Sequence, residues 1–153
     1  VTNELLKIIP AFREQPGRLL VCATNFIRAL DTAFLRHGRF DYVIPIGLPD
    51  VHAREAMWQR FIPATVVDSV DIAQLVERTE GFSPADIEFA ARSASQRALE
   101  KAVYDDGGSG LAPNGRKGPA TQDYLDAIGD TRTTVSAEVH QDFLEDIDVL
   151  GRV

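Results

Sequence analysis

Residues 30–41 read LDTAFLRHGRFD, in which a short helix is predicted to begin at an Asp31 cap and to end at Gly38. Asp31 is a residue type that caps helix N-termini, and Gly38 is the type that ends helices. Arg36 and Arg39 stand three positions apart on either side of this glycine turn. Because their guanidinium groups are permanently charged and fork-shaped, we expect both to point in nearly the same direction. The alternative is a pair of ordinary surface arginines bound to the neighbouring aspartates.

Two apolar runs flank this stretch. Residues 19–23, LLVCA, predict a parallel strand covered on both faces, in which Cys22 is a small buried hydrophobe. Residues 42–46 predict a second strand segment, placed at an edge or strand end by Pro45. Asn25 follows the first run, where α/β sheets open onto ligands, so its amide is suited to orient a water or contact a terminal phosphate. Local backbone hydrogen bonding at a strand end is the alternative for this asparagine.

Helical periodicity dominates the rest of the chain. An N-terminal helix is predicted to end at Pro10 and the following Gln15-Pro16-Gly17. The Gly- and Pro-rich residues 104–120 predict a flexible connection. Four aromatic residues, Trp58, Phe61, Phe82 and Phe89, occur at spacings typical of a packed core. From residue 50 onward, five helices are expected, introduced by Asp50, Asp71, Ser83, Thr121 and Ser136.

The order of these features closely resembles a known family. Ala23-Thr24-Asn25, residues 30–41 and the IPIGLPD of residues 44–50 resemble the second region of homology of AAA ATPases. The EGFSPAD of residues 80–86 resembles the start of the sensor-two helix in the family's helical lid. The resemblance covers nearly the whole chain and is strongest to the valosin-containing-protein-like and proteasomal-ATPase-like branches.

This resemblance implies a mostly helical chain made of two parts. Residues 1–47 are expected to be the incomplete C-terminal part of an α/β nucleotide-binding subdomain, a remnant of a P-loop NTPase sheet. Residues 48–153 are expected to be the all-α helical lid bundle. Standing alone, the segment before Pro49 should be poorly stable or self-associating, because its strands lack sheet partners.

The resemblance also implies roles for five residues. Asn25 matches the sensor-one position, and Arg36 and Arg39 match arginine fingers inserted into the neighbouring subunit's nucleotide site. Such guanidinium groups stabilise charge that develops during phosphoryl transfer. Pro84 and Ala85 fall where many relatives have Gly-Ala against the adenine. Pro84 departs from that pattern, because proline has no amide donor and adds a ring.

The P-loop (Walker A) and acidic metal-binding strand (Walker B) that the family uses are absent from this sequence. Residues 110–118, GLAPNGRKG, imitate the glycine spacing, but Arg116 precedes the lysine and no Ser or Thr follows. One cysteine and three scattered histidines offer no metal site of their own. The resemblance implies ATP and magnesium as cofactors of the complete module. We expect this segment alone to bind neither tightly and to be inactive.

Net charge and composition limit the classes of partner that the chain is expected to bind. The net charge of −7 argues against nucleic-acid and anionic-membrane binding, including a helical DNA-binding domain. With no membrane-length apolar run and no secretory pattern, a cytoplasmic location is expected. The resemblance implies ATP hydrolysis by a homo-oligomeric ring, a hexamer in the family, that remodels or unfolds protein substrates. The alternative is a catalytically inert interaction or oligomerisation module without nucleotide chemistry.

Overall fold

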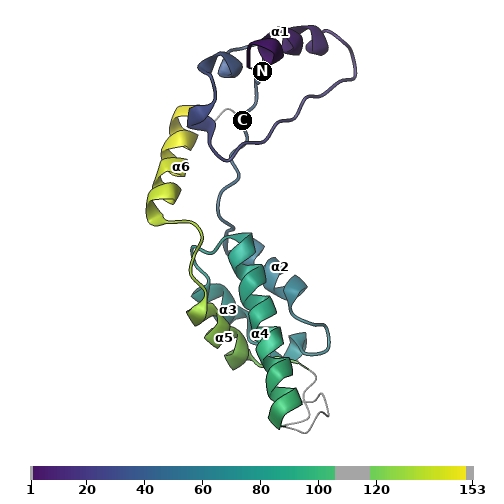
Figure 1. Cartoon of the computed structure of the whole chain (residues 1–153), viewed down its shortest axis with the longest axis vertical. Coiled ribbons are helices and arrows are strands. Elements are labelled where there is room, and N and C mark those ends of the chain that lie inside the picture. Colours follow the sequence, from purple (N-terminus) through teal and green to yellow (C-terminus); the bar gives the residue numbers. More distant parts are fainter. Residues whose placement is uncertain (1, 106–117, 151–153) are drawn as a thin grey trace. The chain divides into compact units, whose positions relative to one another are not determined.

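The computed structural model describes residues 2–105 and 118–150. The chain forms two compact units, one made of Val1–Ile46 with Glu138–Val153 and the other of Gly47–Ala137 (Figure 1). We call them the N-terminal unit and the helical unit. Most of the expected connection 104–120 and all but the last residue of the P-loop-like stretch 110–118 lie outside the described residues.

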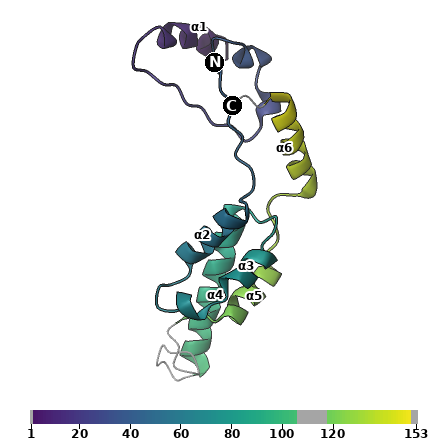
Figure 2. The ribbon, with the colours of Figure 1, turned by 180° about the vertical axis from the view of Figure 1, so that it is seen from behind.

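The helical unit is built around one long helix. Helix α4 (Pro84–Asp105) packs against α2 (Val51–Phe61) and α5 (Thr121–Asp130), and α3 (Ile72–Arg78) contacts α2 and α5 (Figure 2). A short 3-10 turn, η3 (Val67–Ser69), lies between α2 and α3.

The predicted capping residues account for where three of these helices begin. The Asp50 carboxylate accepts the Ala53 N–H at 2.8 Å at the start of α2. That of Asp71 accepts the Gln74 N–H at 3.1 Å at the start of α3. Ser83 precedes α4 as predicted. The expectation for Thr121 was wrong: Thr121 is the first helical residue of α5, and its hydroxyl accepts the Asp71 N–H at 3.0 Å instead of capping its own helix.

Trp58 and Tyr124 form the centre of the helical unit's core. Both side chains are fully buried, and their rings meet edge to face with centroids 5.7 Å apart. The Trp58 indole N–H donates to the Thr79 hydroxyl at 3.2 Å, so the one polar atom of this side chain is satisfied. Helix α4 closes the core with small side chains that permit close packing, at Ala90, Ala91, Ala94 and Ala98.

Of the four predicted core aromatics, two are buried, one is half-buried and one is exposed. Trp58 and Phe82 are buried, and Phe61 packs half-buried against the same core. The prediction for Phe89 was wrong, since its side chain is 56% exposed. At about 100° per residue, position 89 falls on the face of α4 opposite the stripe that contains Ile87 and Ala91.

The N-terminal unit contains α1 (Thr2–Arg13), two 3-10 turns, η1 (Ile27–Ala29) and η2 (Thr32–Leu35), and α6 (Ala137–Leu150). Helix α1 continues through Pro10, which does not end it, and stops at Arg13, just before the predicted stop at Gln15-Pro16-Gly17. Helix α6 begins directly after Ser136. From Glu138 onward, α6 is grouped with the N-terminal unit.

The two predicted strands do not form within the described residues. Residues 19–23 and 42–46 are extended, and only Val43 takes part in an isolated β-bridge. Cys22, expected inside a buried strand, is exposed. A strand needs a hydrogen-bonded neighbour and covered faces, and the described part of the chain supplies neither. Leu19 and Ile46 are consequently 85% and 87% exposed.

These bare extended segments predict self-association of the chain. Unpaired backbone edges carrying exposed apolar side chains favour pairing between molecules. Replacing Val21 and Ile46 together by Lys should shift sedimentation velocity profiles at micromolar concentration toward the monomer. The matched control is Leu99→Lys, which charges an exposed apolar position on helix α4. An equal shift in the control would contradict the edge-pairing explanation.

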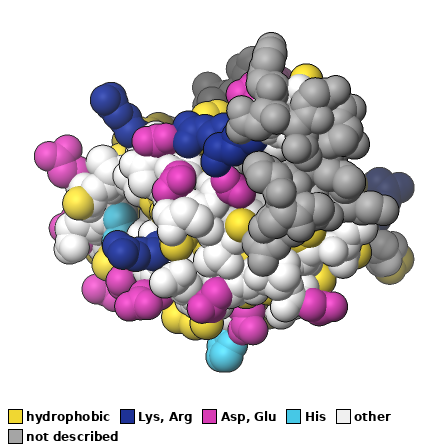
Figure 3. Space-filling view, turned by 90° about the horizontal axis from the view of Figure 1, so that it is seen from below, with side chains coloured by type: hydrophobic (Ala, Val, Ile, Leu, Met, Phe, Trp, Pro, Cys, Tyr) yellow, Lys and Arg dark blue, Asp and Glu magenta, His cyan; other side chains and the backbone are white. Residues whose placement is uncertain are grey.

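On one face of the molecule, the charged side chains are of both signs (Figure 3). Figure 3 shows acidic and basic side chains interspersed on one face, with no continuous basic field among the atoms described there. No helix in residues 2–105 and 118–150 is long and apolar enough to cross a membrane.

Candidate functional site

The stretch of residues 31–41, which we call the arginine turn, is held by local contacts. The Asp31 carboxylate accepts the Ala33 N–H at 2.9 Å and starts η2. The buried Phe34 ring lies 6.2 Å from that of Phe40, whose N–H donates to the Phe34 carbonyl at 3.2 Å. This closes the chain on itself between Phe34 and Phe40, so the two arginines in between lie on a fixed backbone.

Gly38 and Asp41 complete the turn. Gly38 has a φ of +87°, a left-handed conformation that side chains other than glycine's adopt at a cost. Its N–H donates to the Asp41 carboxylate at 2.8 Å. The other oxygen of that carboxylate pairs with the Arg13 guanidinium at 2.6 Å, which ties the turn to α1.

The two predicted finger arginines differ in their surroundings. Arg39 is half-buried, and its guanidinium donates to the Ala33 carbonyl at 2.5 Å. Arg36 is exposed, and within the described residues its side chain has neither an ion pair nor a hydrogen bond. Because Asp31 caps η2 and Asp41 binds Arg13, neither carboxylate is paired with either arginine. Arg36 thus offers all its guanidinium donors outward, while Arg39 uses one to brace the turn.

A shallow hollow of about 400 Å³ adjoins Arg36. Its lining includes His37, so a second group that can carry positive charge borders the same space. The remaining lining residues are Thr32, Leu35 and Leu150.

Asn25, the predicted sensor, lies on the exposed extended segment that precedes η1. The adjacent backbone is locally ordered, since the Thr24 hydroxyl accepts the Phe26 N–H at 3.1 Å. Among the described residues, no hydrogen bond joins the Asn25 side chain to Arg36 or Arg39.

Pro84 and Ala85 are exposed at the first two positions of α4, in the helical unit. The neighbouring residues Ser83 and Asp86 cap the N-terminus of α4. The Ser83 hydroxyl accepts the Asp86 N–H at 3.2 Å, and the Asp86 carboxylate accepts the Ser83 N–H at 2.8 Å. This reciprocal arrangement is a capping box.

Asp86 also binds the segment after α5. Its carboxylate accepts the Thr134 N–H at 3.2 Å and the Thr134 hydroxyl at 3.2 Å, and the side chain is only 2% exposed. Burial alone would raise the pKa of Asp86, but the hydrogen bonds from Ser83 and Thr134 outweigh it and lower the pKa. The carboxylate is therefore a structural anchor for the start of α4.

The lowered pKa of Asp86 predicts a pH-dependent loss of stability. The contribution is complete above about pH 4, the ordinary aspartate pKa, and is lost as the pH falls through the lower folded-state pKa. Asp86→Ala should lower the free energy of unfolding by about 1–2 kcal/mol at pH 7, and the deficit should shrink near pH 2. Urea titrations at both pH values measure this, with exposed Asp68→Ala as control. A deficit independent of pH would refute the assignment.

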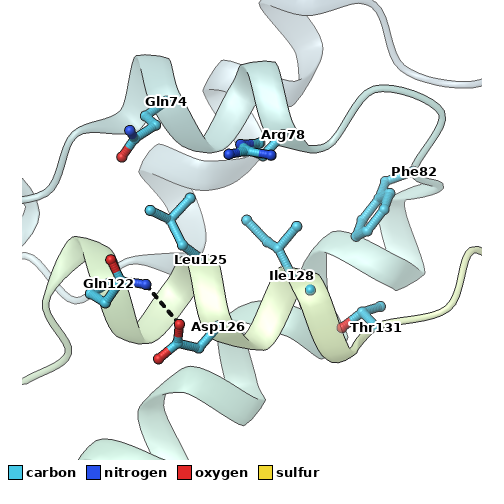
Figure 4. Close-up of a pocket in the computed structure, with 9 residues that line it drawn as sticks. Gln74, Arg78, Phe82, Gln122, Leu125, Asp126, Ile128 and Thr131 are labelled. Atoms are coloured by element: carbon cyan, nitrogen blue, oxygen red, sulfur yellow. Dashed lines mark hydrogen bonds between the residues drawn. The ribbon is translucent and has the colours of Figure 1, made fainter.

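A groove of about 570 Å³ lies between α3 and α5 of the helical unit (Figure 4). Its lining combines an apolar surface with polar side chains, and the Gln122 amide donates to Asp126 at 2.7 Å. Sequence reasoning missed this groove, because it is formed by helices far apart in the chain. Its lining residues are Gln74, Arg78, Phe82, Gln122, Leu125, Asp126, Ile128, Gly129 and Thr131.

Part of the helical unit matches a known protein family. Residues 69–104, from the end of η3 through most of α4, match the family described as "AAA+ lid domain". The chain is 42% identical over 94 residues to the ATP-dependent zinc metalloprotease FtsH of Staphylococcus haemolyticus, covering 61% of this chain and 13% of that protein. It is 41% identical over 100 residues to FtsH 2 of Alkaliphilus metalliredigens, covering 65% and 14%.

Residues 69–104 belong to the AAA+ lid domain family. A solved FIGL-1 AAA domain has the same fold, with a TM-score of 0.77 at 23% identity over 98% of this chain and 50% of that one. The chain spans between 8% and 15% of the length of curated relatives such as these. The mostly helical architecture expected from the resemblance is thereby confirmed.

Proposed function

We propose that this AAA+ segment is the C-terminal part of an ATPase module whose complete protein binds and hydrolyses ATP as a homo-oligomeric ring. The lid match at residues 69–104 supports membership of such a module. The matched relatives named ATP-dependent metalloproteases support ATP use. Remodelling or unfolding of protein substrates in the cytoplasm, by a hexamer, follows from the family resemblance and is part of the proposal.

The exposed Arg36 on its braced turn carries this proposal. A guanidinium that has no partner within its own described surroundings, on a backbone fixed by Phe34 and Asp41, is suited to a phosphate supplied by another subunit. Ordering a flexible arginine at the moment of reaction costs free energy, and a rigid turn lowers that cost. We assign Arg36 as the principal trans finger.

Arg39 takes a second, supporting role in this proposal. Its hydrogen bond to the Ala33 carbonyl keeps the turn in place and leaves its other guanidinium donors for a ligand. Asn25 is assigned as the cis sensor on the resemblance, and Pro84 and Ala85 as an adenine-side contact at the exposed start of α4.

The residues present fit only part of a nucleotide site. A free guanidinium fits a phosphate, and an exposed helix start fits the edge of a base. No group of His, Cys, Asp or Glu in residues 2–105 and 118–150 is arranged to hold a metal ion, so we assign no magnesium ligand to this segment. In the complete module, ATP would supply the phosphoryl group, and Arg36 together with magnesium would stabilise the negative charge that develops on it.

Two measurements test the proposal. Steady-state phosphate release by the complete protein should show ATP turnover, whereas calorimetric titration of this chain alone with magnesium-ATP should show negligible affinity. Absence of turnover by the complete protein would favour the alternative, an inert interaction or oligomerisation module. Tight binding by the isolated chain would contradict the assignment of the phosphate-holding groups to the rest of the module.

A further inference from the structure

Arg28 of η1 makes a dense set of charged contacts with α6 in the N-terminal unit. Its Nε lies 2.6 Å from Asp146 Oδ1, and its Nη1 lies 2.9 Å from Asp142 Oδ1. Its Nη2 donates to the Asp142 backbone carbonyl at 3.0 Å and to Glu145 Oε2 at 3.2 Å. One guanidinium thus contacts three carboxylates and the backbone of the same helix.

Apolar packing contributes much less to the position of α6. Neither η1 nor α6 contains a buried residue in the structure, and both Val139 and Val149 are largely exposed. Three apolar side chains of this helix, Phe143, Ile147 and Leu150, are only half-buried. The hydrophobic effect scales with the apolar area removed from water, so it contributes little to the stability of the contact between α6 and the rest of the N-terminal unit.

The charges around Arg28 are unbalanced. Three carboxylates face one guanidinium, and no other Lys or Arg in the described part of the chain forms an ion pair with α6. Asp146 and Asp142 raise the pKa of Arg28, chiefly through the hydrogen bond to Asp146, so the arginine stays charged at every accessible pH. Without Arg28, the acids would repel one another on one side of the helix.

We propose that α6 is a detachable helix, held on the N-terminal unit by the Arg28 ion cluster rather than by a buried core. Breaking this cluster releases α6 and leaves α1 and the arginine turn folded. Because a free helix of 14 residues is marginal in water, released α6 also unwinds. Salt screens exposed ion pairs, so ionic strength controls the release.

Hydrogen exchange of the full chain tests this proposal. Arg28→Ala should raise the exchange of α6 amides about threefold to tenfold, with α4 unchanged. Raising NaCl to about 0.5 M should do the same to the wild-type chain but add little in Arg28→Ala. Arg92→Ala is the matched control, since it removes an exposed arginine that pairs with Glu88 on α4. A charge swap, Arg28→Asp with Asp146→Arg, should restore part of the protection.

Three outcomes would overturn the proposal. The first is unchanged α6 exchange in Arg28→Ala, and the second is an equal rise in Arg92→Ala. The third is a joint rise in α1 and α6 when salt is added to the wild-type chain, which would mean that the whole unit opens together. The salt arm needs no substitution, so it remains decisive even if a variant does not fold.

Discussion

Arg36→Ala is expected to lower ATP turnover by the complete AAA+ protein about 10³-fold or more, with ATP affinity nearly unchanged. An arginine that stabilises charge developing on the transferred phosphoryl group acts in the transition state, so its removal affects turnover far more than binding. The substitution should cost little stability, because Arg36 is exposed and has no bonding partner among the described residues.

Two controls sharpen this prediction. Arg36→Lys keeps the charge but loses the planar fork, so it should restore only part of the turnover. Arg60→Ala removes an exposed arginine from the last turn of α2 and should leave turnover within about twofold of wild type. Full turnover by Arg36→Ala, or an equal loss in Arg60→Ala, would contradict the finger assignment.

Trp58→Ala is expected to cost about 3–5 kcal/mol in the free energy of unfolding of the helical unit. The indole is fully buried against Tyr124, and its N–H is bonded to Thr79. Truncation therefore opens a large cavity and leaves the Thr79 hydroxyl without one partner. Such a loss is comparable to the whole stability of many domains.

Tyr124→Phe is the matched control for this core substitution. The Tyr124 hydroxyl is buried without a hydrogen-bond partner of normal geometry in the described part of the chain, and burial raises the pKa of this group to about 12. Removing it should change the free energy of unfolding by less than about 1 kcal/mol. Urea titration followed by far-UV circular dichroism measures both variants. A loss below about 1 kcal/mol in Trp58→Ala would show that this core is not the source of stability.

Local signals in the sequence predicted the helical unit well. Asp50, Asp71 and Ser83 cap helices where expected, because a cap depends on residues only three positions away. Thr121 failed as a cap because its hydroxyl is used by Asp71, 50 residues earlier in the chain. Phe89 shows a related limit of sequence reasoning. Phenylalanine is a typical core residue, but position 89 lies on the exposed face of α4.

The features that depend on distant partners were predicted less well. The apolar runs at residues 19–23 and 42–46 have strand character, yet a strand forms only with a neighbour to bond to, and none is present among the described residues. The Arg28 cluster joins η1 to a helix 114 or more residues later, which no local pattern indicates. By contrast, the arginine turn was apparent from its sequence, because the Asp31 cap, the hydrogen bond between Gly38 and Asp41 and the contact of the Phe34 and Phe40 rings all lie within residues 31–41. The different surroundings of Arg36 and Arg39 became visible only in the structure.

Mixing two inactive forms of the complete protein tests the central claim, that Arg36 acts in a neighbouring subunit's site. One form carries Arg36→Ala with an intact nucleotide site, and the other keeps Arg36 but has its own nucleotide site inactivated. In mixed rings, the intact sites lie beside subunits that still supply Arg36, so ATP turnover should recover to well above that of either form alone. No recovery, in rings shown by native mass spectrometry to be mixed, would contradict a role for Arg36 in trans.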